Sequence, residues 1–370
     1  MNSSGLGKKF LLLAVSSLVS LLIAEIVVRI VMPQDLITNT SWYQANPIYR
    51  FRHRENMDRR MRWGTYYHLK TNFRGLREDR DIPYDAVGKW RVVIHGDSFT
   101  FGNGVEREFI FPVVAQAYLW DKGIANAEVI NLGVSAHGPS LEYLYFQEEG
   151  KKYHPQVVAI AAFPANDVAD EVRDRAFIIQ DGKLIFQPYQ IPLTKRLTDN
   201  FLYQALINHS HLLVALRLRF FSGNPPGLEK VYSKEEDFAK NITAAVAVWQ
   251  AFAQEIKAFG AVPVILILPT REQIYARQGR PLPTDPYPIA EPARRALAQM
   301  CVEQNLHCLD LLPVMADKLK NPDAAFIKAL EGHIDFHYNA LGHRMVGVEL
   351  GKLLWNMARE NPPAPRDENK

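Results

Sequence analysis

The most informative stretch of the sequence is Arg91-Val-Val-Ile-His-Gly-Asp-Ser-Phe-Thr-Phe-Gly102. Its apolar run, Val92 to Ile94, predicts a buried strand that ends at Gly96-Asp-Ser98, and a helical pattern begins near Glu108. In open α/β sheets, active sites gather at the carboxyl ends of the strands. Ser98 is therefore a candidate nucleophile whose backbone N–H could face an anion. A strand-to-helix loop with a capping Asp or Ser explains the tripeptide equally well.

Three distant segments favour the functional interpretation. They are Glu128-Val-Ile-Asn-Leu-Gly-Val134, Val157-Val-Ala-Ile-Ala-Ala-Phe-Pro-Ala-Asn-Asp167 and Asp335-Phe-His-Tyr-Asn-Ala-Leu-Gly-His343. The first two predict short buried strands, which end at Gly133 and deliver Asn166. Each segment thus places a polar side chain or a glycine beside a predicted strand end or helix start. The residues with this placement are, in chain order, Ser98, Gly133, Asn166 and His337.

In this order the sequence resembles the SGNH/GDSL hydrolase family, which is named after those four residue types. The form Gly96-Asp-Ser-Phe-Thr-Phe-Gly102, with Asn72-Phe-Arg-Gly-Leu-Arg77 upstream, is similar to a bacterial, membrane-anchored branch of that family. Each motif is short, so the specificity comes from the set. The resemblance implies a three-layer α/β/α fold with a flavodoxin-like parallel sheet, preceded here by one transmembrane helix.

The resemblance also assigns roles that suit acyl transfer. Ser98 would be the nucleophile, because a hydroxyl attacks only when a base activates it. His337 would be that base and later the general acid, and Asp335 would orient its ring. Many family members place the acid three residues before the histidine, whereas here the spacing is two. If Asp335 points away, a backbone carbonyl could orient the ring instead.

The same resemblance implies an oxyanion hole made of the Ser98 N–H, the Gly133 N–H and the Asn166 side-chain amide. Taken singly, Gly133 is equally explained as a turn glycine and Asn166 as an Asx-turn residue. His343 lies at the start of a predicted amphipathic helix, so we expect a packing or capping residue there and no second base.

The N-terminus predicts a membrane anchor. Phe10 to Val31 is mostly apolar, and its 22 residues would form a helix of about 33 Å, long enough to cross a bilayer. Lys8 and Lys9 precede the run, which places the short tail in the cytoplasm. No convincing signal-peptidase site follows, so an uncleaved signal anchor is preferred. Glu25 and Arg29 are four residues apart and could pair on one helix face. They could instead mark the outer membrane interface, which is the interpretation we favour, or contact another membrane protein.

The remaining chain divides by composition and periodicity. After a cytoplasmic tail (1–9) and the anchor (10–31), we expect an irregular, aromatic-rich juxtamembrane extension (32–88) that packs in part on the following domain (89–358). An insertion (168–235) breaks the alternation of strands and helices. It contains a predicted hairpin around Asp181-Gly182 and a helical stretch (198–221), and we expect it to form a lid. The Pro-rich tail (359–370) is predicted to be disordered.

Alternating patterns predict the elements of the domain. Helices are expected near 108–122, 139–151, 236–259, 290–304 and 340–358, and further strands near 261–269 and 305–311. Such alternation indicates a parallel sheet covered on both faces.

Composition narrows the functional classes. The chain has 370 residues with 48% hydrophobic and 22% charged side chains, which is typical of a globular protein. A net charge of only +3 argues against nucleic acid as a partner. The sequence shows no metal-ligand spacing and no phosphate- or dinucleotide-binding glycine pattern, so we expect no metal and no cofactor. Cys301 and Cys308 could pair in an oxidising compartment, but we expect them not to.

These observations lead to one main hypothesis. It is a membrane-tethered serine esterase or O-acyltransferase that acts outside the cytoplasm, on the periplasmic side of a bacterial inner membrane, through an acyl-enzyme on Ser98. The substrate would be an acylated glycan or lipid, and the resemblance implies a multi-pass membrane acyltransferase as a partner. A non-catalytic glycan-binding or scaffold subunit with the same fold is the alternative. A phosphoesterase would need a metal cluster that the sequence does not show.

Overall fold

The computed structural model describes residues 3–34, 36, 42–85, 87–180, 183–221, 235–280, 282 and 284–360. Its contacts divide the chain into two units. One unit, here called the helical unit, comprises Met1–Trp42 and Pro192–Pro225. The other, here called the sheet unit, comprises Tyr43–Ile191 and Pro226–Lys370.

The sheet unit is built on five parallel strands in the order β6-β5-β7-β10-β11. Their bounds are β5 Trp90–Gly96, β6 Ala127–Asn131, β7 Val157–Ala162, β10 Val262–Ile267 and β11 His307–Asp310. Numbered along the chain the order is 2-1-3-4-5, which is the flavodoxin-like order. The three central strands are almost wholly buried, which explains their continuous apolar sequences.

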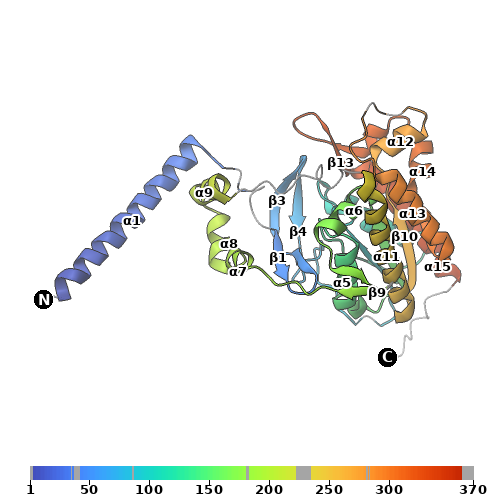
Figure 1. Ribbon diagram of the computed structural model, residues 1–370, viewed down its shortest axis with the longest axis horizontal. Helices are drawn as coiled ribbons and strands as arrows, with labels where there is room; N and C mark the ends of the chain where they lie inside the picture. Colours follow the sequence, from blue (N-terminus) through green and yellow to red (C-terminus); the bar gives the residue numbers. More distant parts are fainter. Residues whose placement is uncertain are drawn as a thin grey trace. The chain divides into compact units, whose positions relative to one another are not determined.

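Helices cover both faces of the sheet and complete three layers (Figure 1). One face packs against α4 Phe111–Asp121, α12 Arg271–Arg277, α14 Leu311–Lys318 and α15 Ala340–Glu360. The other face packs against α5 Pro139–Glu148, α6 Pro164–Arg173, α11 Glu235–Phe259 and α13 Ala290–Glu303. Short 3-10 turns occur at Arg107–Phe109, Gly150–Tyr153 and Pro322–Ala325. The expected fold class is thereby confirmed.

The expectation of an irregular extension was wrong for residues 43–70 and holds for the described residues between 71 and 88, which form no helix or strand. Residues 43–70 form two antiparallel hairpins, β1 Tyr43–Asn46 with β2 Arg50–His53, and β3 Asp58–Trp63 with β4 Thr65–Lys70. Tyr67 and Leu69 of β4 are buried, whereas Tyr66 before them and His68 between them are exposed. This alternation is that of a strand with one face on a core. The expected packing of aromatic residues on the domain is confirmed for Tyr49 and Tyr67.

The insertion is divided between the two units. The predicted hairpin is present in the sheet unit as β8 Phe177–Gln180 and β9 Lys183–Phe186, although its turn lies outside the described residues. The helices α7 Leu193–Thr198, α8 Phe201–Ile207 and α9 His211–Phe221 belong to the helical unit. The lid therefore stays a prediction, and the C-terminal tail from residue 361 lies outside the described residues.

The N-terminal helix α1, Ser3–Val31, is the other part of the helical unit. Its segment Gly7–Val31 has a mean hydropathy of 2.6 and is long and apolar enough to cross a membrane. Glu25 and Arg29 form the ion pair that their spacing allows, 3.0 Å from oxygen to nitrogen.

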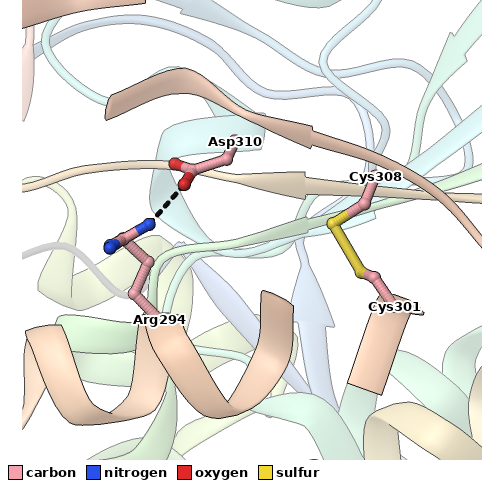
Figure 2. Close-up of a disulfide and its surroundings, with 4 residues drawn as sticks. All are labelled: Arg294, Cys301, Cys308 and Asp310. Atoms are coloured by element: carbon pink, nitrogen blue, oxygen red, sulfur yellow. Dashed lines mark hydrogen bonds and ion pairs between the residues drawn. A yellow bond between two sulfur atoms is a disulfide. The ribbon is translucent and has the colours of Figure 1, made fainter. Parts of the chain in front are cut away.

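The two cysteines are paired, contrary to expectation. Cys301 in the last turn of α13 and Cys308 on β11 form a disulfide with their Cα atoms 6.0 Å apart (Figure 2). The tight connection between helix and strand brings the two residues within the separation that a disulfide needs. Arg294 of the same helix forms an ion pair with Asp310 of the same strand, so two links hold this helix to the sheet edge.

Candidate active site

The nucleophile candidate lies on a helix that sequence analysis did not anticipate. A one-turn helix, α3 (Ser98–Phe101), begins directly after β5, well before the helix predicted near Glu108. Asp97 caps it, because its Oδ1 accepts a hydrogen bond of 2.8 Å from the Phe99 N–H. Ser98 therefore stands at the carboxyl end of a central strand, in the first position of the turn.

The structure brings Ser98, His337 and Asp335 together. Ser98 Oγ lies 2.8 Å from His337 Nε2 although the two residues are 239 positions apart. His337 and Asp335 lie on β13 (Ile334–Tyr338), which pairs antiparallel with β12 (Phe326–Lys328). Residues two apart on a strand face the same side, and Asp335 Oδ1 lies 2.7 Å from His337 Nδ1. The unusual spacing of two is thus compatible with a hydrogen-bonded relay.

The hydrogen bonds also indicate the tautomer of His337. Trp63 Nε1 of β3 lies 3.0 Å from His337 Nδ1, and its ring packs edge-on against the imidazole. Nδ1 can accept from Trp63 or donate to Asp335, but not both at once. Because the carboxylate accepts the stronger hydrogen bond, we assign the proton to Nδ1. Nε2 is then free to accept the hydroxyl proton of Ser98.

Asp335 is held in its charged form. Burial by itself raises the pKa of this carboxyl, but the hydrogen bonds and the charge of His337 outweigh that effect and lower the pKa below its ordinary value. Asp335 Oδ1 also accepts the backbone N–H of His337 at 2.8 Å. The carboxylate is therefore fixed in position and suited to stabilise an imidazolium.

Asn166 lies near the nucleophile turn, in the first turn of α6. Its Nδ2 donates a hydrogen bond of 2.8 Å to Asp97 Oδ2, so Asp97 connects α3 with α6. An amide nitrogen carries two hydrogens, which leaves one for an oxyanion. Burial raises the pKa of Asp97, although the hydrogen bonds from Asn166 and Phe99 lower it in part.

Gly133 has a different role from the expected one. Its N–H already donates to Asn131 Oδ1 at 2.9 Å and is therefore not free for an oxyanion. A Cβ at this position would collide with the Phe101 nitrogen and lie 2.7 Å from Thr100 Cβ. Gly133 is thus needed for the close approach of α3.

Another backbone group near the end of β6 is free. Ala136 has φ of +67°, a conformation that residues other than glycine rarely adopt. Its N–H, like that of Ser98, has no acceptor among the described residues. The Ser98 N–H lies at the nucleophile itself, and Ala136 follows β6, the strand beside β5 in the sheet. Nothing in the sequence marks Ala136, because alanine is not typical of this conformation.

Three further residues shape the site and were not identified from the sequence as doing so. Trp63 contacts His337 from the first part of the chain, and Asp97 connects the nucleophile helix to Asn166. Arg77 is buried and donates to the backbone oxygens of Phe101, Gly102 and Val105, which end the nucleophile turn. For Arg77 the available signal was the Asn72–Arg77 motif, which indicated a family branch and no contact, and for Asp97 it was its place in the Gly96-Asp-Ser98 motif.

His343 and His95 lie outside the relay and have structural roles. His343 Nδ1 accepts the Phe111 N–H at 3.3 Å, as expected of a capping residue. Burial lowers the pKa of His343 and of His95 to about 3, so both are neutral at physiological pH. Among the described residues no three His, Cys, Asp or Glu side chains are grouped so that they could hold a metal ion.

Comparisons with known proteins give distant likenesses. No protein-family model matches the chain, and no curated protein matches it. Solved structures similar to it include an acetyl xylan esterase, AlAXEase (14% identity, TM-score 0.43, 72% of this chain and 98% of that one). A lipase/acylhydrolase from Enterococcus faecalis has 14% identity and a TM-score of 0.40, over 75% of this chain and 99% of that one.

The psychrotrophic esterase EstA from Pseudoalteromonas sp. is also similar, with 13% identity and a TM-score of 0.40, over 73% of this chain and 98% of its own. A putative lipolytic protein of the G-D-S-L family from Desulfitobacterium hafniense is similar as well, with 18% identity and a TM-score of 0.39, over 71% of this chain and 98% of that one. Likenesses at this level carry no inference about activity. Function must therefore be judged from the geometry of Ser98, His337 and Asp335.

Proposed function

We propose that this chain is a serine esterase or O-acyltransferase that forms an acyl-enzyme on Ser98. The observation that carries the proposal is the continuous relay from Ser98 Oγ to His337 Nε2, at 2.8 Å, and from His337 Nδ1 to Asp335, at 2.7 Å. A nucleophile, a base and an orienting carboxylate in hydrogen-bond contact are what covalent acyl transfer requires.

The reaction follows from these contacts. Ser98 Oγ attacks the acyl carbonyl while His337 Nε2 takes the hydroxyl proton. The tetrahedral intermediate collapses, the bond to the leaving alcohol breaks, and Nε2 returns the proton to that alcohol. Water or a sugar hydroxyl then attacks the acyl-serine by the same proton transfers, and Ser98 is regenerated. Hydrolysis and transfer differ only in the second acceptor.

The developing oxyanion needs donors that are already in place. We assign this role to the Ser98 N–H and to the second hydrogen of Asn166 Nδ2, with the Ala136 N–H as a further donor. Gly133, whose N–H is engaged, is left out of the hole.

Two observations support a location outside the cytoplasm. The apolar segment Gly7–Val31 begins with Lys8 and Lys9, and basic residues favour the cytoplasmic side. The Cys301–Cys308 disulfide is of a kind that persists in oxidising compartments. We therefore propose a single-pass membrane protein whose sheet unit lies on the periplasmic side.

The substrate and the partner are proposed from the sequence resemblance. We propose an acylated glycan or lipid as the acyl donor or acceptor, and a multi-pass membrane acyltransferase as the partner. The free N–H groups and the free amide hydrogen at the site favour catalysis over the alternative of a non-catalytic scaffold, which would have no need of them.

The test uses the full chain in detergent with p-nitrophenyl acetate. We expect Ser98→Ala and His337→Gln to lower kcat by at least about 10³-fold, because the relay acts as a unit. His343→Gln is the matched control, since its ring lies outside the relay, and it should keep most of the activity. A fluorophosphonate should label Ser98 in the wild type and in His343→Gln, but not in Ser98→Ala or His337→Gln.

Equal activity of the Ser98→Ala variant and the wild type would refute the nucleophile assignment. Absence of labelling together with retained glycan binding would favour the scaffold function. Adding a methyl glycoside to the assay separates the two reactions, since an acetylated sugar indicates transfer and free acetate alone indicates hydrolysis.

A further inference from the structure

The helical unit contains a polar joint between α1 and the helices of the insertion. Glu25 Oε2 accepts hydrogen bonds from Ser210 Oγ at 2.8 Å and from the Leu212 N–H at 2.9 Å. Glu25 Oε1 accepts the His211 N–H at 2.9 Å. The carboxylate of one helix thus caps the first turn of another, α9, which lies beside the C-terminal end of α1 (Figure 1).

Arg29 completes this joint. Its Nη2 donates to Glu25 Oε1 at 3.0 Å and to the backbone oxygen of His209 at 2.8 Å. The ion pair on α1 therefore binds one backbone oxygen just before α9 and the first N–H groups of α9. Charged residues within a membrane span are costly unless they are paired. The insertion supplies the partners that make Glu25 and Arg29 tolerable in an apolar helix.

The position of Glu25 along α1 sets the depth of this contact in the membrane. Glu25 is 15 residues after Phe10, where the apolar run begins, which corresponds to about 22 Å along a helix. A hydrocarbon core is about 30 Å thick. Glu25 and the start of α9 would therefore lie roughly 8 Å inside the outer boundary of the core. Interfacial helices sink about 5–10 Å into the same zone.

The surface of α7, α8 and α9 suits that depth. Phe201 is 79% exposed and Phe220 is 69% exposed, values that are unusual for large apolar side chains in contact with water. The other exposed apolar side chains are Leu193, Leu197, Leu202, Leu206, Leu216 and Leu218. The lysine and arginine residues between positions 193 and 221 are Lys195, Arg196, Arg217 and Arg219, and the single acidic residue there is Asp199, directly after α7.

From these contacts and exposures we propose that residues 193–221 form an interfacial membrane-binding segment. Its leucine and phenylalanine side chains are buried at the boundary between acyl chains and headgroups of the outer leaflet, and its basic residues bind anionic headgroups. The inference rests on the proposed membrane span of α1, and it does not depend on the esterase activity.

The consequence is a second attachment to the bilayer. The chain passes between the helical and sheet units near residues 42, 191 and 225, so three connections join them. A single span with one connection would leave the sheet unit free to swing on one linker. The interfacial segment instead returns the middle of the chain to the membrane.

The test measures depth in the full chain, reconstituted into vesicles of phosphatidylcholine and phosphatidylglycerol. Nitroxide labels are attached to Phe201→Cys, Phe220→Cys, Lys195→Cys, Leu18→Cys and Val87→Cys, one per variant. The native cysteines are joined to each other and do not react. All five positions are exposed, so labelling does not disturb a core. Collision rates are measured with oxygen, which concentrates in lipid, and with a water-soluble nickel complex.

We expect the oxygen-to-nickel ratio at Phe201 and Phe220 to exceed that at Val87 severalfold and to fall below that at Leu18. Lys195 should lie between Val87 and Phe201. Ratios at Phe201 and Phe220 equal to that at Val87 would place the segment in water and overturn the proposal. Shielding from both reagents would also overturn it, because a protein partner or a second copy would then cover the surface.

The Leu18 label separates two kinds of failure. If Leu18 is accessible to nickel, α1 does not span the bilayer and the proposed anchor fails with the inference. If Leu18 is in lipid while Phe201 and Phe220 are in water, only the interfacial segment is refuted. The p-nitrophenyl acetate assay on the same vesicles reports the esterase independently of both.

Discussion

Gly133 packs against the nucleophile turn so closely that it leaves no space for a side chain. A Cβ would collide with the Phe101 nitrogen and crowd Thr100, both of which belong to α3. Gly133→Ala should therefore displace Ser98. We expect a fall in kcat of about 100-fold, because small displacements of reacting groups have effects of that size, and a loss of stability of about 1–3 kcal/mol from overpacking.

Steady-state kinetics on p-nitrophenyl acetate and urea unfolding would measure the two effects. Gly123→Ala is the control, since no heavy atom lies within 4 Å of a Cβ there, although its φ is positive, at +87°. That variant should lose only about 1 kcal/mol of stability and no activity. Alanine retains the backbone N–H, so an unchanged kcat in Gly133→Ala would contradict the steric role.

For single residues, the sequence predicted which side chains take part in the site better than it predicted which atoms they contact. Ser98, His337 and Asp335 were found because their residue types recur in a known order, and the structure brings them together. The role expected of Gly133 was wrong because the partner of its N–H, Asn131, is set by the local turn. Ala136 was missed because its positive φ leaves no trace in composition.

Among the elements, the hairpins of residues 43–70 differ most from the expectation. Their sequences are short and rich in arginine, so the alternation of apolar and polar residues is weak. Only the packing on the sheet unit distinguishes Tyr67 and Leu69, which are buried, from Tyr66. The long helices and the central strands were predicted correctly because their apolar patterns continue over many residues.

A matched pair on β4 tests whether this hairpin is part of the fold. Leu69 is fully buried, whereas Tyr66 is 42% exposed. Leu69→Ala should lower the free energy of unfolding by about 2–5 kcal/mol, as expected for a buried leucine. Tyr66→Ala should change it by less than about 0.5 kcal/mol. Equal, small effects of the two substitutions in urea unfolding would show that the segment is not packed as the structure has it.

At the scale of the whole molecule, the sequence predicted the sheet and its two helical layers, but not how the insertion divides. The hairpin β8–β9 stays with the sheet unit, while α7 to α9 join the N-terminal helix. Glu25 and Ser210 are 185 positions apart. No sequence pattern relates residues that are so far apart in the chain. The hydrogen bonds of Glu25 in the folded structure explain why an apolar helix carries this residue.

Around Asp97 the sheet unit also buries a group of carboxyls, and this group sets a pH dependence. Burial is the main cause that raises the pKa of Asp170 and of Glu171, each to about 7. Burial and neighbouring carboxyls raise the pKa of Glu142 and Asp167 well above their usual values. Groups with raised pKa values stabilise the protein at low pH, and this contribution is lost as the pH rises through the folded-state pKa.

Buried histidines have the opposite effect on the free energy of unfolding, and they act in a lower pH range. Burial lowers the pKa of His95, His137 and His343 to about 3, so they destabilise the fold only below their unfolded pKa of about 6.5. Above that pH the carboxyls dominate. We therefore expect the free energy of unfolding to fall as the pH rises above about 6.5, by up to about 1.4 kcal/mol per pH unit for each carboxyl that is still protonated in the folded state. Asp170 and Glu171 contribute only up to about pH 7, so the fall at higher pH comes from Glu142 and Asp167.

Glu142 offers the sharpest test of this dependence, because neither of its carboxylate oxygens has a hydrogen-bond partner among the described residues. Glu142→Gln keeps the shape of the side chain and removes its charge. The variant should be more stable than the wild type at pH 8, and the difference should shrink as the pH falls toward 5, where Glu142 is protonated in the folded wild type. Urea unfolding at pH 5, 6.5 and 8, followed by tryptophan fluorescence in detergent, measures the difference. A variant that is less stable than the wild type by the same amount at all three pH values would mean that Glu142 is not a buried acid with a raised pKa.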